Sequence, residues 1–246
     1  MQENLSASEQ EYLKTILLVQ QSAGRATIQA LAARMEIKPA SVSAMIRHLA
    51  QDEDGQGAYV THTPYQGVAL TRRGEKVAME LLRHQRLLEL FLAATLDMSW
   101  EQVYDEAERL APFISEDLEE RIAARLGHPT RDQHGDPIPS REGVIDLADD
   151  VPLSTLDVGM SAKVARVPDE DPALLRYLGT LGLVPGAWIA IEGRTPYGDI
   201  LTARIGEATH PLAGEVAKRI SISAGSRRSA QMSYPDSASS SLASPE

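Results

Sequence analysis

The chain has 246 residues, 43% of them hydrophobic, a net charge of −11 and no cysteine, so it is long enough for one large or two modest domains with a sizeable core. The absence of cysteine excludes disulfides, thiolate metal ligands and a cysteine nucleophile, and the negative net charge argues against nonspecific nucleic-acid binding by the whole molecule. Because the sequence has neither a run of about 18 apolar residues nor a charged-then-apolar leader, we expect a soluble, cytoplasmic protein without membrane association.

Apolar residues at helical spacing predict three helices at the start of the chain. The first ends near Gly24, the second follows Thr27 as a favourable N-cap, and the third begins at Pro39, a residue well suited to a first helical turn. The segment AYVTHTPYQGVALT then contains two short β-like runs around PYQG, which predict a hairpin.

A long helix capped by Thr71 is expected after the hairpin, followed by a helix from about Glu101 and another that begins near Ser115. Residues 128–158 are rich in Pro, Gly and Asp and carry no sustained period, which predicts a loop or linker. From 159 to 223 the pattern changes to short strands with one short helix, which predicts a small β-barrel-like domain. The Ser-rich end of the chain is expected to be disordered.

The order helix, turn, helix, hairpin is typical of a winged helix-turn-helix domain that binds DNA. If the apolar stripe of the third helix is buried, its opposite face presents Ser41, Ser43 and Arg47, with Lys38 near the start of the helix. Small residues allow close approach to base edges, and Ser and Arg side chains bind bases or phosphates. We predict that these four residues contact DNA, together with Tyr65 at the hairpin tip. The alternative is an ordinary amphipathic helix with a solvated face.

The most acidic part of the chain is a candidate metal site. Nine acidic residues and a single arginine occupy 97–120, and Glu108 is expected at the edge of the apolar stripe of its helix. Crowded carboxylates repel one another, and a divalent cation relieves that repulsion. Oxygen donors without cysteine suit Mn²⁺ better than softer metals. Glu11 on the first helix and Glu89 on the long helix, with Gln85 one turn earlier, are further candidate ligands.

Several of these residues have a structural alternative. Glu11 is placed to complete a capping box with Ser8. His84 lies about 140° from Glu89 around a helix, so the two are not expected to bind one ion, and a half-buried structural role suits His84. The loop that follows the acidic helices is crowded with His and Asp without regular spacing, and we expect a solvated turn there. Its residues are His128, Asp132, His134 and Asp136.

Five stretches of the chain together resemble the diphtheria toxin repressor family of iron- and manganese-dependent transcription regulators. They are SEQEYLKTI, IKPASVSAMIRHL, GVALTRRGEKVA, VYDEAERLAPFISEDLEERI and GHPTRDQHGDPIP. The later segment LGLVPGAWIAI is similar to the small SH3-like module that many members carry, so the resemblance spans roughly residues 5–223.

The resemblance implies a repressor that binds a palindromic operator as a homodimer when loaded with Mn²⁺, or else Fe²⁺, and controls genes of metal homeostasis. It implies dimerisation through the helices after the hairpin, with the metal tying the first helix to these later helices. The positions that match metal ligands of the family are Glu11, Glu89 and Glu108. The positions that match its reading helix on DNA are Ser41, Ser43 and Arg47.

The chain departs from the family pattern at several of its ligand positions. The Glu-His pair that usually stands three and four residues after Glu108 is replaced by Ala111 and Pro112. The ligand His expected at Gln85 has moved one place, to His84. The candidate metal ligands are therefore Glu11, His84, Gln85, Glu89 and Glu108.

Pro112 suggests how a site depleted in imidazole would work. Proline clashes with the carbonyl four residues back, that of Glu108, and releases it from its helical hydrogen bond. We hypothesise that Glu108 supplies both its side chain and its carbonyl, with Glu11 and Glu89 or Gln85 completing a site of hard oxygen ligands. The alternative is a regulator of the same fold that has lost metal dependence, in which Pro112 merely kinks the helix.

An enzyme is not expected, because the sequence shows no Ser-His-Asp set, phosphate-cradling loop or pair of histidines at metal spacing. We expect a mainly α N-terminal half and a small C-terminal SH3-like β-barrel domain. The expected parts are a winged helix-turn-helix domain (1–74), a helical metal-binding and dimerisation domain (75–140), a linker (141–158), an SH3-like, FeoA-like domain (159–224) and a disordered tail (225–246).

Overall fold

The computed structural model describes residues 5–52, 55–63, 67–96, 98, 100–146, 150–168 and 171–230. The chain divides into two compact units, Met1–Asp146 and Leu147–Glu246, and each is described by itself. Within the described ranges, the helices lack the combination of length and apolar character that a membrane crossing requires.

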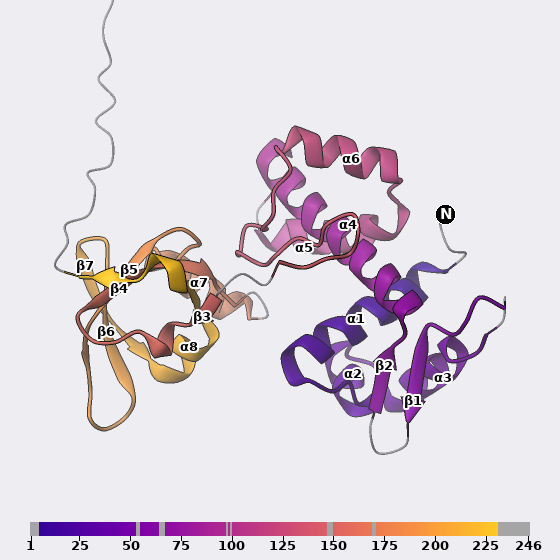
Figure 1. Ribbon diagram of the computed structural model, residues 1–246, viewed down its shortest axis with the longest axis horizontal. Helices are drawn as coiled ribbons and strands as arrows, with labels where there is room; N and C mark the ends of the chain where they lie inside the picture. Colours follow the sequence, from indigo (N-terminus) through magenta and orange to yellow (C-terminus); the bar gives the residue numbers. More distant parts are fainter. Residues whose placement is uncertain are drawn as a thin grey trace, which may run out of the picture. The chain divides into compact units, whose positions relative to one another are not determined.

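The first unit begins with the predicted three helices and hairpin (Figure 1). The elements are α1 (Ala7–Ala23), α2 (Ile28–Arg34), α3 (Pro39–Leu49), β1 (Val60–Thr63) and β2 (Gly67–Leu70). The two strands pair antiparallel, with Val60 opposite Leu70. Side chains of all three helices and both strands form one buried apolar cluster, so the hairpin is fixed to the helices by a shared core.

Short-range signals set the helix ends. Ser6 caps α1 and forms a capping box with Glu9, because the Ser6 side chain accepts from the Glu9 amide and the Glu9 carboxylate accepts from the Ser6 amide. The capping box expected between Ser8 and Glu11 is therefore wrong, since the helix begins two residues earlier. This leaves the Glu11 carboxylate available for contacts with other helices. Gly24 ends α1 with a left-handed φ of 70°.

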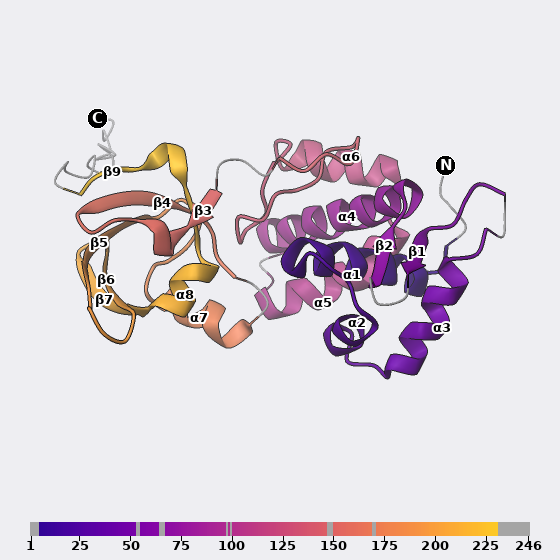
Figure 2. The ribbon, with the colours of Figure 1, turned by 60° about the horizontal axis from the view of Figure 1, so that its bottom comes forward.

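α4 (Arg72–Leu96) runs from the hairpin into the helical half of the unit, so the expected boundary at residue 74 lies inside its first turn. It contacts α1 and, further along, α5 (Trp100–Leu110) and α6 (Glu116–Arg125) (Figure 2). A second buried apolar cluster joins α4, α5 and α6. The helix expected from about Glu101 is α5, and it ends at Leu110. The chain then passes through a 3₁₀ turn, η1 (Ala111–Phe113), that contains Pro112.

The second unit is an antiparallel sheet with two short helices, and its core is formed by apolar residues such as Leu178, Ile189 and Ile222. The elements are β3 (Asp150–Pro152), η2 (Leu153–Thr155), β4 (Met160–Arg166), α7 (Pro172–Thr180), β5 (Trp188–Arg194), β6 (Ile200–Ile205), β7 (Ala208–Ala213), α8 (Gly214–Arg219), β8 (Ser221–Ser223), η3 (Ala224–Ser226) and β9 (Arg228–Ser229). The strand order is β3-β8-β4-β5-β6-β7, with β9 paired to β4.

Two predicted boundaries of this region are wrong. The end of the expected linker forms β3, which pairs with β8, and Leu153 just after it is fully buried. The start of the expected tail forms β9, whose Ser229 lies opposite Met160 of β4. Both strands have at most three residues, too few to show a period, so they depend on their partners in the sheet. Residues 231–246 of the expected tail lie outside the described residues.

Candidate metal centre and nucleic-acid interface

The exposed face of α3 carries the residues predicted to contact DNA. The apolar stripe of this helix is buried, whereas Lys38, Ser41 and Arg47 are exposed. Ser43 is half-buried, and its hydroxyl donates to the Pro39 carbonyl at 2.9 Å, so only its oxygen remains to accept a further hydrogen bond. Tyr65 lies outside the described residues.

Three of the predicted metal ligands meet around an ammonium group. Lys14 of α1 is 2% exposed. Its Nζ lies 2.9 Å from Oε2 of Glu11, 2.6 Å from Oε1 of Gln85 and 3.3 Å from Oε1 of Glu108. Burial raises the pKa of the Glu11 carboxyl, and Glu108 adds to this effect, while the Lys14 ammonium opposes it. The group joins α1, α4 and α5 through one buried positive charge, which we call the Lys14 junction.

His84 lies apart from this junction. Its Nδ1 is 3.1 Å from the Ala111 carbonyl oxygen, and its Nε2 is 3.3 Å from Oε2 of Glu119 on α6. Glu119 also accepts from Arg83 at 2.8 Å. The ring therefore links α4 to η1 and α6, and both nitrogens face groups other than Glu89. This geometry matches the structural alternative for His84 rather than a shared ion with Glu89.

The loop after α6 folds into a buried turn. The Asp132 carboxylate accepts from the backbone amides of His134 at 2.9 Å and Asp136 at 2.8 Å, and Gly135 provides a left-handed φ of 89°. Nε and Nη2 of Arg86 on α4 approach Asp132 and Asp136 at 3.5 and 3.6 Å. The solvated turn predicted from the sequence is therefore wrong for Asp132, His134 and Asp136, because the turn directs their side chains toward α4, where all three are buried.

This buried turn brings two potential ligands to Glu89. Glu89, Asp132 and His134 each offer a ligand atom, and these atoms all lie within 4.8 Å of one another. All three side chains are buried. The sequence predicts Glu89 as a ligand but not Asp132 or His134, because the spacing of these two residues follows no helical or strand period. Their crowding within DQHGD was the available signal. We call this group the Glu89 cluster.

The electrostatics of the Glu89 cluster favour a cation. Burial, and after it the neighbouring Asp136 carboxylate, raises the pKa of Asp132 to about 7, against the opposing effect of the Arg86 guanidinium. A divalent ion stabilises closely spaced buried carboxylates in their charged form. Two carboxylates and one imidazole are a donor set suited to Mn²⁺ or Fe²⁺, so the residues present fit such an ion.

Gln85 connects the two groups. Its Oε1 accepts from Lys14 at 2.6 Å, and its Nε2 donates to Oε1 of Glu89 at 2.9 Å. The amide thus presents its oxygen to the ammonium and its nitrogen to the carboxylate. The predicted ligands Glu11 and Glu108 belong to the Lys14 junction, and Glu89 belongs to the Glu89 cluster.

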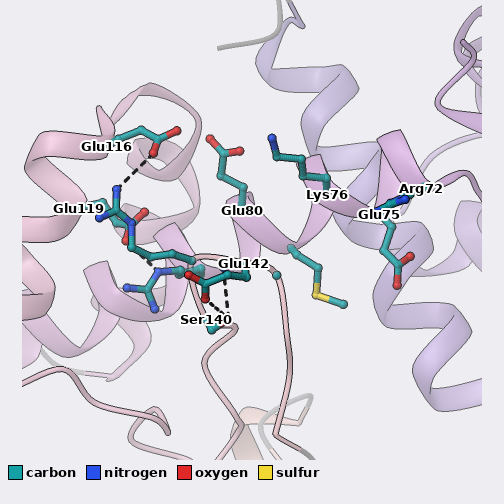
Figure 3. Close-up of a pocket in the computed structure, with 12 residues that line it drawn as sticks. Arg72, Glu75, Lys76, Glu80, Glu116, Glu119, Ser140 and Glu142 are labelled. Atoms are coloured by element: carbon teal, nitrogen blue, oxygen red, sulfur yellow. Dashed lines mark hydrogen bonds and ion pairs between the residues drawn. The ribbon is translucent and has the colours of Figure 1, made fainter. Parts of the chain in front are cut away.

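A surface pocket of about 550 Å³ lies between the first half of α4, the start of α6 and the loop at 140–143 (Figure 3). Charged side chains dominate its lining, and several are already paired. Arg83 contacts Glu119 at 2.8 Å, and Arg141 contacts Glu116 at 3.6 Å. Because these opposite charges offset one another, the pocket offers no concentrated charge for a ligand.

The segment from the end of α5 to the start of α6 exposes large apolar side chains. Phe113 is 73% exposed, and Leu110 and Leu118 are also exposed. Contiguous exposed apolar patches are typical of surfaces that contact other proteins.

Three family models match consecutive parts of the chain. The iron dependent repressor N-terminal DNA-binding domain matches residues 4–68, the iron dependent repressor metal-binding and dimerisation domain matches 71–140, and the FeoA domain matches 151–224. Together they follow the winged helix and hairpin, the helical half of the first unit, and the sheet of the second.

Curated relatives and solved structures agree with these matches. The iron-dependent repressor IdeR of Mycobacterium tuberculosis is 29% identical over 226 residues, covering 86% of this chain and 94% of that protein. The regulator MntR of Oceanobacillus iheyensis is 30% identical over 115 residues, covering 47% and 74%. A manganese-dependent transcriptional repressor solved in complex with manganese is 34% identical with a TM-score of 0.77, covering 87% and 99%. The structure of T. acidophilum IdeR is 26% identical with a TM-score of 0.71, covering 90% and 99%.

Proposed function

Because the chain belongs to the diphtheria toxin repressor family of metal-dependent transcription regulators, we propose that it binds operator DNA as a homodimer and that a divalent metal ion at the Glu89 cluster sets its affinity for DNA. The proposed ion is Mn²⁺ or Fe²⁺, and the proposed targets are genes of metal homeostasis. The observation that supports this proposal is a buried group of side chains that could hold a metal ion, in the same compact unit as the exposed face of α3.

Glu89, Asp132 and His134 are the residues that would hold the ion. When bound, the ion supplies a divalent positive charge beside the buried carboxylates. Glu89 belongs to α4, and the other two belong to the loop after α6, so the three residues connect elements 43 and 45 positions apart in the sequence. Arg86 holds the loop in place through its contacts with Asp132 and Asp136. Because α4 continues from the hairpin, the position of this helix affects both the metal-binding residues and the reading domain.

The proposed DNA contacts come from α3. Arg47 and Lys38 are exposed cations suited to phosphates or base edges, and Ser41 is a small exposed residue that allows close approach. The Ser43 hydroxyl already donates its hydrogen to the Pro39 carbonyl, so its oxygen can contact DNA only as an acceptor. A contact from Tyr65 at the hairpin tip stays a prediction from the sequence.

The proposed homodimer uses the exposed apolar segment that contains Leu110, Phe113 and Leu118. Burial of these side chains against a second copy would remove apolar surface from water. A two-fold dimer presents two reading helices to the two halves of a palindromic operator.

A gel shift on DNA from upstream of the protein's own gene tests the function, with Mn²⁺, Fe²⁺ and a chelator in parallel lanes. We expect a shift with metal that is lost in chelator. Variant His134→Ala should lose the metal response, whereas Arg47→Ala should weaken the shift both in Mn²⁺ and in Fe²⁺. Equal binding in chelator would indicate a regulator of the same fold without metal dependence, and the absence of any shift would contradict the proposal.

A further inference from the structure

We propose that Lys14 is a built-in cation that fixes α1 to α4 and α5 without a metal ion. Its ammonium occupies the centre of the group formed by Glu11, Gln85 and Glu108, residues to which the sequence assigned a metal. The inference about this junction rests on its own geometry. Its corollary, that metal dependence is confined to the Glu89 cluster, rests on the proposed function.

The contacts of the ammonium match its donor capacity. A lysine ammonium has three N–H donors, and Nζ of Lys14 has three oxygen partners at 2.6, 2.9 and 3.3 Å. Each partner adds a separate connection. Glu11 lies one helical turn from Lys14 on α1, Gln85 is on α4, and Glu108 is on α5. The ammonium therefore joins three helices at a single buried point.

The charges of the junction show why a cation is needed there. Glu11 and Glu108 bring two carboxylates into one partly buried group, and burial together with Glu108 raises the pKa of Glu11. The Lys14 side chain is 3% exposed. Removing one partner of a buried ion pair leaves the other charge uncompensated, which is strongly destabilising. Lys14 thus neutralises the Glu11 and Glu108 carboxylates, which a divalent ion would otherwise do.

The same geometry argues against a metal ion at this point. A hard divalent cation binds oxygens at about 2.0–2.6 Å, so it would have to take the position of the ammonium and displace a buried lysine. Two cations this close would repel each other strongly. Furthermore, Ala111 and Pro112 offer no ligand side chains where the family pattern has Glu and His. The residues of the Lys14 junction therefore do not fit a metal ion while Lys14 is present.

The experiment measures Mn²⁺ stoichiometry by equilibrium dialysis and metal-free thermal stability by circular dichroism in chelator. The full chain is compared with Lys14→Ala and with a control, Lys76→Ala, which removes an exposed lysine of α4. We expect Lys14→Ala to melt several degrees lower in chelator and to gain one Mn²⁺ ion per chain, because Glu11 and Glu108 then face an open space. Lys76→Ala should do neither.

His134→Ala separates this inference from the proposed function. We expect the single variant His134→Ala to bind no Mn²⁺. We expect the double variant, which carries both His134→Ala and Lys14→Ala, to bind one Mn²⁺ ion per chain. Unchanged Mn²⁺ binding in His134→Ala would contradict the proposed metal site. If Glu108→Gln in that background also left Mn²⁺ binding unchanged, the Lys14 junction would stand, whereas loss of the ion would overturn it. If Lys14→Ala matches Lys76→Ala in both measurements, the proposal for Lys14 is overturned.

If Lys14→Ala does not fold, a second variant tests whether the Lys14 junction excludes metal. Glu108→Gln removes one carboxylate of the junction and keeps Lys14. The proposal predicts the same number of bound Mn²⁺ ions as in the unmodified chain. Loss of an ion in Glu108→Gln would show that the junction binds metal with Lys14 in place and would overturn the proposal.

Discussion

The raised pKa of Asp132 predicts that Mn²⁺ binding weakens as the pH falls from 8 to 6. A metal-binding carboxylate must lose its proton, so protons compete with the ion. With a pKa of about 7, the factor (1 + 10^(pKa − pH)) is about 1.1 at pH 8 and about 11 at pH 6, which gives a roughly tenfold rise in Kd from this group alone. A carboxyl at its ordinary pKa of 3.8 would give no change over this window.

The raised pKa of Asp132 also affects the stability of the metal-free protein. This stability falls as the pH rises, whereas the affinity for Mn²⁺ increases. Because the pKa of Asp132 is raised in the folded state, this state binds more protons than the unfolded chain between about pH 4 and pH 7. The resulting stabilisation is fully present below pH 3.8 and is lost as the pH rises through about 7. The metal-free protein should therefore lose stability from this group between pH 5 and pH 8, where metal affinity increases.

Isothermal titration with Mn²⁺ at pH 6, 7 and 8 measures the first effect, and thermal melting in chelator measures the second. Asp132→Asn is the matched control, since its amide oxygen still accepts from His134 and Asp136 while its charge is absent. We expect the variant to bind Mn²⁺ more weakly at pH 8 and to be more stable than the parent in chelator at that pH. Equal Mn²⁺ affinity of the parent at pH 6 and pH 8 would refute the reasoning.

Three further outcomes are expected. Gly74→Ala should lower the free energy of unfolding by about 1–3 kcal/mol in urea denaturation, because an added Cβ would collide with the Tyr59 carbonyl; unchanged stability would contradict this close approach. Phe113→Glu should shift the protein from dimer to monomer in analytical ultracentrifugation, and a persistent dimer would exclude this surface as the interface. Arg47→Ala should weaken operator binding and, if it contacts a phosphate, reduce the slope of log K against log salt by about one; an unchanged affinity would remove Arg47 from the interface.

Local rules account for the elements that were predicted correctly. Thr27 caps α2 through its side chain, Pro39 begins α3, and Ser115 caps α6. Each of these signals acts over three or four residues, so it can be read from the sequence. The capping box shows the limit of such rules, since Ser6–Glu9 and Ser8–Glu11 have the same spacing and only the actual start of the helix distinguishes them.

The side chains proposed to bind metal come together through contacts that sequence periodicity does not report. Asp132 and His134 reach Glu89 through a turn held by side-chain and backbone hydrogen bonds, so their spacing resembles neither a helix nor a strand. Lys14 meets Gln85 and Glu108 across 71 and 94 positions of the chain. Its role could not be found on α1 alone, where it resembles any lysine one turn after a glutamate.

The central claim is that metal at the Glu89 cluster controls DNA binding. Fluorescence anisotropy of a labelled operator fragment tests it directly, with operator affinity measured in free Mn²⁺ and in chelator for the parent and for His134→Ala. We expect Mn²⁺ to strengthen binding by the parent about tenfold or more, and to leave His134→Ala at the affinity that the parent has in chelator. Equal operator affinity of the parent in Mn²⁺ and in chelator, or a full metal response in His134→Ala, would contradict the claim.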